Sequence, residues 1–145
     1  MEIMGTTLAV AASALRAERQ RLDIIASNLA NANTTETAAG GPYKRRNVIF
    51  KARAVESDFG DTLVALGDQP QGVQVTDVIE DQTPPRQVFD PGHPDANAEG
   101  YVLYPNINPV TEMVDLQTAT RAYEANVQVV NATKKMAESA LAIGA

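Results

Sequence analysis

The chain has 145 residues, a formal net charge of −6 and no cysteine. This length allows one ordinary domain, or a helical part with a small insert. The missing cysteines exclude a disulfide framework, a thiolate metal site and a cysteine nucleophile, and the acidic balance argues against a general nucleic-acid binder.

Residues 1–33 carry apolar side chains that alternate at spacings of four and three, interrupted only by Glu18. These positions are Met4, Leu8, Ala11, Leu15, Leu22, Ile25 and Leu29. A seven-residue period predicts a long helix that packs along another helix. Glu2 is the only charge before Arg16, whereas a cleavable signal needs Lys or Arg there, so we expect no signal cleavage. The sequence contains no run of eighteen apolar residues, so no membrane span is predicted.

Asparagines mark the expected end of this helix, at Asn28, Asn31 and Asn33. Asparagine tolerates the left-handed conformation and bonds to nearby backbone, so one interpretation is a frayed helix cap followed by a loop. In the other, the amides bond to a neighbouring chain. The two interpretations are compatible.

Residues 34–104 predict a turn-rich linker and then a small, irregular β-rich insert. Extended segments are expected at 43–53, at 72–79, around Gln87 and at 98–104, with proline-rich turns between them. From Glu56 to Gly100 there are ten acidic residues and one basic residue, a net charge of −9. Such a segment is expected to face solvent.

One basic cluster precedes this acidic stretch. It consists of Lys44, Arg45, Arg46, Lys51 and Arg53. Alternation along a strand sends neighbouring side chains to opposite faces, which argues against a phosphate-binding surface. We expect the cluster to protect a strand edge or to complement an acidic neighbour.

Residues 105–145 predict a second long helix, uninterrupted by Pro or Gly from Val110 to Ile143. One heptad seam runs through Met113, Leu116, Thr120, Tyr123, Val127, Val130, Lys134, Ala137 and Leu141. A second seam runs through Ala119, Ala122, Asn126, Val129, Thr133, Met136, Ala140 and Ile143. One partner helix would cover only a narrow seam, so this wide apolar arc predicts more than one neighbour.

Enzyme and metal chemistry finds little support in the sequence. His93 is the only histidine and lies in a Gly-Pro turn, where exposure is expected. Acidic residues around Asp90 and Asp95 lack the spacing of an EF-hand calcium loop. No phosphate-binding loop or nucleophile elbow is present, so we expect no catalytic residues, no cofactor and no metal.

Three stretches together resemble one known family. They are RLDIIASNLANANT near the start, GGPYKRRNVIF after the linker and GYVLYPNINPVTEMVDLQTATRAYEANVQVVNATKKM near the end. In this combination the chain is similar to the bacterial flagellar basal-body rod proteins. Its short length fits the proximal rod better than the longer distal rod or hook proteins.

The resemblance implies a non-enzymatic structural subunit of the rod, a torque-transmitting shaft. It implies export through the flagellar type III apparatus without signal cleavage, and a place in the basal body, in the periplasmic space. Partners would be further copies of the chain and other rod proteins. It also implies packing and inter-subunit roles for Leu22, Asp23, Ile25, Ala26, Asn28, Leu29, Asn31, Arg121, Ala122, Tyr123, Glu124, Asn126 and Val127.

We therefore predict an α+β fold in which two terminal heptad helices form an antiparallel coiled-coil-like pair around the insert. The expected parts are an N-terminal rod helix (1–33), the linker and insert (34–104) and a C-terminal rod helix (105–145). The expected assembly interface comprises Met4, Leu8, Leu15, Leu22, Ile25, Asn28, Leu29, Asn31, Met113, Leu116, Tyr123, Asn126, Val127, Val130, Met136 and Leu141. The alternatives are a peripheral membrane protein or another coiled-coil adaptor, although the first helix lacks a lysine-rich polar face.

Overall fold

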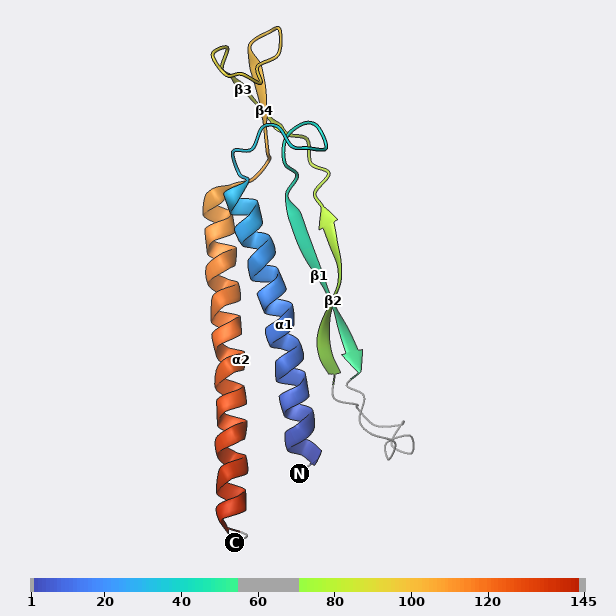
Figure 1. Ribbon diagram of the computed structural model, residues 1–145, viewed down its shortest axis with the longest axis vertical. Helices are drawn as coiled ribbons and strands as arrows, with labels where there is room; N and C mark the ends of the chain where they lie inside the picture. The colour runs from blue at the N-terminus through green and yellow to red at the C-terminus, as the bar shows by residue number, and fades with distance from the viewer. Residues whose placement is uncertain (1, 55–70, 144–145) are drawn as a thin grey trace.

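The computed structural model describes residues 2–54 and 71–143, and part of the acidic stretch, residues 55–70, lies outside this description. Its elements are α1 (Glu2–Ala30), β1 (Arg46–Ala54), β2 (Gln71–Glu80), β3 (Arg86–Phe89), β4 (Tyr101–Tyr104) and α2 (Pro109–Ile143). The two helices lie side by side and antiparallel, the β1–β2 hairpin runs along α1, and the β3–β4 hairpin projects beyond the helices at one end (Figure 1). The predicted α+β arrangement is confirmed.

Helix α2 begins at a well-formed cap. The side chain of Asn108 accepts a hydrogen bond from the backbone N–H of Val110 at 3.0 Å, and its carbonyl accepts one from Glu112 at 3.1 Å. Pro109 occupies the first helical position, where its missing N–H costs nothing. With 35 residues, α2 is about 52 Å long at about 1.5 Å per residue, and it extends past the N-terminal end of α1 (Figure 1).

Helix α1 ends among the asparagines, as predicted. Asn31 donates its side-chain N–H to the carbonyl of Ser27 at 2.9 Å, and its own carbonyl accepts from the N–H of Thr34. These bonds satisfy backbone groups that the helix end leaves unpaired. The local-cap interpretation therefore describes Asn31, but through hydrogen bonds alone: among the described residues only glycines have a positive φ, so the left-handed conformation is not used at this helix end.

Strands β1 and β2 form an antiparallel ribbon from the pair Arg46–Glu80 to the pair Ala54–Gln71. The register shifts between Ile49 and Phe50, so Thr76 has no partner residue and forms a β-bulge. A bulge bends the bulged strand and increases its twist. The ribbon can thereby follow the curved surface of α1.

Strands β3 and β4 pair antiparallel, and their connecting loop returns at Gly100. Gly100 has φ of +83°, and a Cβ there would lie 2.9 Å from the Phe89 ring. A side chain at this position would meet both backbone strain and a clash. Glycine thus lets Phe89 pack edge-on against Tyr101, with 5.3 Å between ring centroids.

The buried hydrophobic core is small and consists mostly of short side chains. Its members are Ala11, Ala17, Ile25, Ala32, Val102, Ile107 and Ala119. Alanines at a helix contact allow close approach of the backbones but bury little apolar area. Many larger apolar side chains consequently remain on the surface.

Candidate assembly interface

The face of α2 that meets α1 follows a strict heptad seam. Its residues are Glu112, Leu116, Ala119, Tyr123, Asn126, Val130, Thr133 and Ala137, and all are buried or half-buried. Leu116, Tyr123, Val130 and Ala137 come from the first predicted seam, whereas Ala119, Asn126 and Thr133 come from the second. Each predicted seam therefore supplies one row of the actual contact.

The remaining rows of the predicted seams lie on the two sides of this contact, because adjacent heptad positions lie side by side on the helix surface. The first flank consists of Met113, Thr120, Val127, Lys134 and Leu141. The second flank consists of Ala122, Val129 and Met136, whereas Ala140 continues the contact row of Ala119, Asn126 and Thr133. Met113 and Met136 are 55% and 58% exposed, so α1 covers only the middle of the apolar arc.

The ends of α2 expose further apolar surface. Val110 and Val114 lie beside Met113 on the helix surface and are 68% and 57% exposed. Leu141 continues the first flank at the other end and is 65% exposed, because α2 extends past the N-terminal end of α1 (Figure 1). Val127, in the middle of the first flank, is half-buried.

On α1, the predicted leucine seam lies at the edge of the contact. Met4, Leu15, Leu22 and Leu29 are half-buried and Leu8 is exposed. The fully buried positions of α1 are Ala11, Ala17, Ile25 and Asn28, of which Ala11 and Ile25 belong to the predicted seam. Both α2 and the β1–β2 ribbon pack on α1. Because these two neighbours lie on different sides of α1, the row Leu8, Leu15, Leu22 and Leu29 does not lie at the centre of either contact.

A buried polar cluster joins both helices to the start of β1, and we call it the polar junction: Asn28, Tyr43, Arg45, Arg46 and Glu112. The Asn28 side chain donates to the Arg46 carbonyl at 2.8 Å and to Glu112 at 3.2 Å. It accepts from the Arg46 N–H at 2.9 Å and from the Tyr43 hydroxyl at 3.1 Å. Asn28 is 1% exposed, so its amide is used inside the chain rather than offered to a neighbouring one.

The Glu112 side chain is 1% exposed and forms an ion pair with Arg45, a residue of the insert. The Nε of Arg45 donates to its Oε1 at 2.5 Å, and another Arg45 nitrogen lies 3.5 Å from Asp115. A buried carboxylate is tolerated only when it is paired and hydrogen-bonded. The junction meets this condition with groups that are distant in sequence, and so fixes the helices relative to each other and to the ribbon.

Two arginines of the basic cluster therefore form their contacts within the chain. Arg45 pairs with α2, and Arg46 bonds to Ser27 and Tyr43 and lies over the Tyr43 ring at 5.4 Å. Lys44, just before β1, and Lys51, on β1, are exposed. Glu112 could not be recognised as the partner of Arg45 from local patterns, because the two residues are 67 positions apart in the chain.

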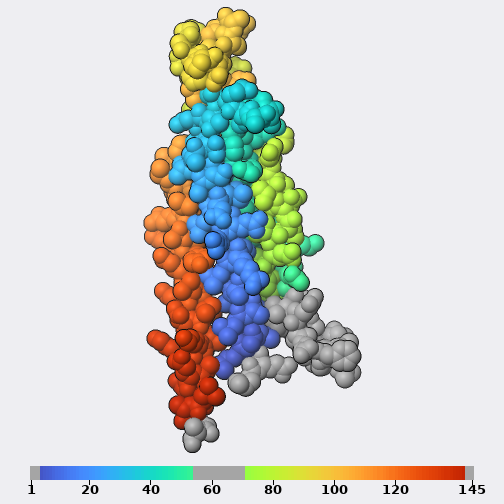
Figure 2. All heavy atoms as spheres, viewed as in Figure 1, coloured from blue at the N-terminus to red at the C-terminus, as the bar shows by residue number. Residues whose placement is uncertain are grey.

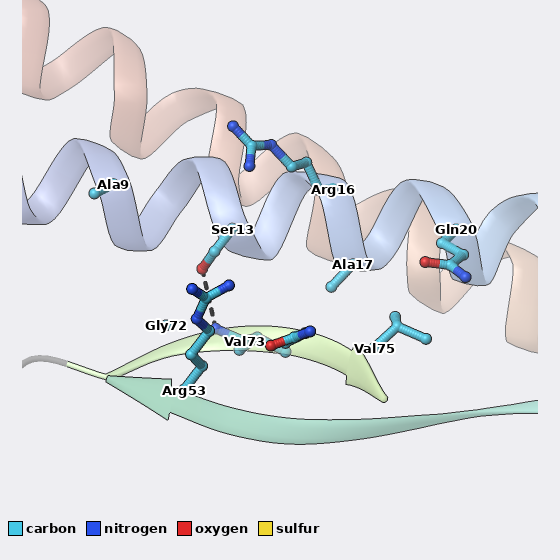
Figure 3. Close-up of a pocket in the computed structure, with 10 residues that line it drawn as sticks. Ala9, Ser13, Arg16, Ala17, Gln20, Arg53, Gly72, Val73 and Val75 are labelled. Atoms are coloured by element: carbon cyan, nitrogen blue, oxygen red, sulfur yellow. Dashed lines mark hydrogen bonds between the residues drawn. The ribbon is translucent and has the colours of Figure 1, made fainter. Parts of the chain in front are cut away.

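A groove of about 340 Å³ separates α1 from the β1–β2 ribbon. In Figure 3, Ser13 and Ala17 point from α1 toward Val73 and Val75 on the ribbon, whereas the Arg16 side chain extends from the other side of α1, away from the ribbon. Ser13 closes the groove on one side, since its hydroxyl accepts from the Val73 N–H at 3.0 Å and donates to the Val10 carbonyl at 2.7 Å. Both charged residues in the lining are arginines.

Other candidate sites offer little chemistry. His93 is partly exposed, lies 3.8 Å from Asp95 and packs edge-on against Tyr104. Among residues 2–54 and 71–143, acidic, histidine and cysteine side chains do not gather in threes as a metal site would require. Over the same ranges, the helices lack the length and apolar content of a membrane span.

Comparison with known proteins agrees with this architecture. Residues 8–36 match the family described as flagella basal body rod protein, and residues 98–143 match the family described as flagellar basal body rod FlgEFG protein C-terminal. The two matches fall on α1 and on β4 with α2. The shared regions are therefore the ones that form the helix pair.

Full-length relatives extend the match over nearly the whole chain. The flagellar basal-body rod protein FlgC of Bacillus subtilis is 45% identical over 144 residues, covering 95% of this chain and 96% of the relative. FlgC of Escherichia coli O6:H1 is 44% identical over 135 residues, with 93% of each chain covered. FlgC of Borreliella burgdorferi is 41% identical over 148 residues, with 95% of each covered. The chain belongs to the FlgC family of flagellar basal-body rod proteins, and it is a structural subunit of the flagellar basal body.

Proposed function

We propose that this chain assembles through its terminal helices, with further copies and with other rod proteins, into a torque-transmitting shaft. The observation that supports this most directly is the exposure of both flanks of α2 beside a seam that α1 fills. A helix with apolar surface on two sides of its partner has room for two more neighbours. Contacts of this kind that do not close on themselves produce an open helical assembly.

The apolar residues on the flanks can supply binding energy in assembly. Full burial of a Met, Val or Leu side chain contributes about 1.5–3 kcal/mol relative to exposure. Met113, Val129, Met136 and Leu141 are each at least 45% exposed in the single chain. Covering them in the shaft would stabilise the assembled state over the free chain.

The proposal includes a purely mechanical role without catalysis, cofactor or metal. It also includes delivery through the flagellar type III export apparatus and a final location in the periplasmic part of the basal body, without signal cleavage. Family membership supports both statements, and the heptad pattern from Met4 to Leu29, interrupted only by Glu18, continues through the region where a signal would be cleaved. The parts 1–33, 34–104 and 105–145 would act as inner helix, outer insert and inner helix.

The test is replacement of Met136 by Asp, with Gln128→Asp as the matched control on the exposed face of the same helix. A carboxylate on the second flank would have to be desolvated in the assembled contact, at a cost of several kcal/mol. We expect Met136→Asp to abolish incorporation into basal bodies purified from a strain lacking the native copy, with loss of swimming. Gln128→Asp should incorporate normally.

The two substitutions change helix propensity similarly, so folding of the free chain should be alike in circular dichroism. Leu22→Asp and Val127→Asp are also expected to block incorporation, but both positions are half-buried and would weaken the helix pair as well. Normal incorporation and swimming with Met136→Asp would refute the role of the flanks.

A further inference from the structure

Helix α2 carries a charged surface between its two flanks, on the side away from α1. Among residues 2–54 and 71–143, α1 is the only helix or strand that packs against α2, and Figure 2 shows the outer edge of α2, in orange and red, with no other segment over it. Three rows of exposed residues follow one another around this side, from the first flank to the second. They are an acidic row (Gln117, Glu124, Asn131 and Glu138), a basic row (Arg121, Gln128 and Lys135) and a small row (Thr118, Ala125, Ala132 and Ser139).

The charges on these rows are available to a neighbour. The side chains of Arg121, Glu124 and Lys135 form no hydrogen bond or ion pair within the part of the chain that the structure describes. Glu138 lies 3.9 Å from Lys134, and these two side chains are 64% and 74% exposed. An ion pair this exposed contributes little to stability, so Glu138 can exchange it for another cation.

The charge pattern repeats with the period of the apolar seam. A basic residue is followed three positions later by an acidic one in Arg121 with Glu124, and again in Lys135 with Glu138. The second pair comes fourteen residues, or two heptads, after the first. Charges that keep the period of a heptad seam are typical of the rims of a helix–helix contact, where they choose the partner and its orientation.

Two α2 helices that pack first flank against second flank bring the acidic row of one copy toward the basic row of the next. The small row lies between the second flank and the basic row, so the long side chains of Arg121 and Lys135 have room to reach across. A shift of three residues, about 4.5 Å at about 1.5 Å per residue, aligns Glu124 with Arg121. The same shift aligns Glu138 with Lys135, because both pairs have the same spacing.

The apolar side chains fit the same register. The shift places Val127 of the first flank between Ala122 and Ala125 of the neighbour, as a knob between small residues. It places Gln128 opposite Asn131, so the control substitution Gln128→Asp creates no pair of like charges. One register therefore satisfies the charged and the apolar residues together.

We propose that α2 of one copy packs in parallel against α2 of a second copy, first flank to second flank, with the acidic row of one facing the basic row of the other. The pairs are Glu124 with Arg121 and Glu138 with Lys135. Because the two flanks differ, each copy binds one neighbour on each side, and the contact does not close as a two-fold dimer. The helices are parallel because copies related by rotation about one shaft axis keep the same direction. This inference rests on the proposed assembly and adds its partner, direction and register.

The chain has no cysteine, which permits a direct crosslinking test. Thr120→Cys places a thiol on the first flank and Thr118→Cys places one on the small row, both at exposed positions that face each other in this register. Each variant is carried by a separate copy in the same cell, and basal bodies are isolated and oxidised. We expect a disulfide-linked dimer only when both variants are present. Ser139→Cys in place of Thr118→Cys should give none, since exposed Ser139 meets Thr120 only in an antiparallel pair.

A charge reversal tests the chemistry of the contact. Arg121→Glu with Lys135→Glu, in the copy that carries Thr118→Cys, should lower the dimer yield roughly tenfold, because two exposed ion pairs become pairs of like charges. Glu124→Lys with Glu138→Lys in the other copy should restore most of the yield. Pairs at i and i+3 within one helix cannot be restored from a second copy, so loss without this rescue would refute the contact. Incorporation of the reversed copies without cysteines should fall and recover in the same way.

The outcomes separate this contact from the proposed function. Normal incorporation of both cysteine variants without a linked dimer would refute the contact and leave the rod assignment intact. A dimer of Thr120→Cys with Ser139→Cys would refute the parallel direction. A photo-crosslinking amino acid in place of Thr120 should capture a second copy of this chain, and capture of another rod protein instead would refute that partner. Failure of the unmodified chain to enter the rod would overturn the proposed assembly itself.

Discussion

Asn28→Ala is the sharpest test of how this fold is held together. The Asn28 side chain makes four hydrogen bonds, two with the backbone of Arg46 and one each with Tyr43 and Glu112. Each such bond contributes about 0.5–1.5 kcal/mol net, and a buried group left without a partner costs about 1–3 kcal/mol. Because Tyr43 and Arg45 can still serve some of the remaining groups, we expect a loss of about 2–4 kcal/mol in the free energy of unfolding.

The measurement is urea unfolding of the purified chain followed by far-UV circular dichroism, with thermal unfolding alongside. For a chain of this size, such a loss lowers the melting temperature by roughly 6–12 °C. Asn33→Ala is the matched control, since Asn33 is exposed three residues after the helix end. We expect the control to stay within about 0.5 kcal/mol of the native chain.

A second substitution distinguishes hydrogen bonding from packing. Asn28→Asp keeps the shape and the two acceptor sites but removes the donors, and it places a carboxylate where an amide now lies 3.2 Å from Glu112. Two buried like charges repel, so this variant should be at least as unstable as Asn28→Ala at neutral pH. If either variant matched the Asn33→Ala control, the polar junction would not be what holds the helices and ribbon in register.

Three further predictions concern the cap of α2, the β1–β2 ribbon and the β3–β4 hairpin. Asn108→Ala removes the side chain that caps α2 and should cost about 1 kcal/mol in urea unfolding; an unchanged midpoint would contradict the cap. Ser13→Ala removes the acceptor for the Val73 N–H. Because such a bond contributes about 1 kcal/mol, hydrogen exchange at the Val73 amide should accelerate roughly fivefold. The exchange rates of amides in α2 should not change. Gly100→Ala meets a positive φ and the Phe89 ring 2.9 Å away and should cost about 1–3 kcal/mol, with altered aromatic signals in near-UV circular dichroism; an unchanged spectrum would argue against the tight turn.

The existence of the two helices could be predicted from sequence because heptad spacing is a local property. Met113, Leu116 and Tyr123 recur on one side of any helix that contains them, whatever lies nearby. The turn residues and alternating segments between 43 and 104 likewise report local backbone preferences. The same local patterns carried the family resemblance, which the full-length relatives confirm.

The choice of seam needed the tertiary structure. On α2 four neighbouring heptad rows consist mostly of apolar or small residues, and any adjacent two could face a partner by periodicity alone. Ala119 and Leu116 face α1, while Met113 and Met136 do not, because the polar junction fixes the rotation of α2 about its own axis. The contact that sets it, between Asn28 and Glu112, joins residues 84 apart in the chain.

Residue spacing alone was thus enough to establish two amphipathic helices separated by a small β-rich insert. Which apolar residues are buried on folding and which remain exposed for assembly could be seen only once the elements were packed together. Periodicity defines a surface along one element, whereas the burial of that surface depends on the other elements that pack against it.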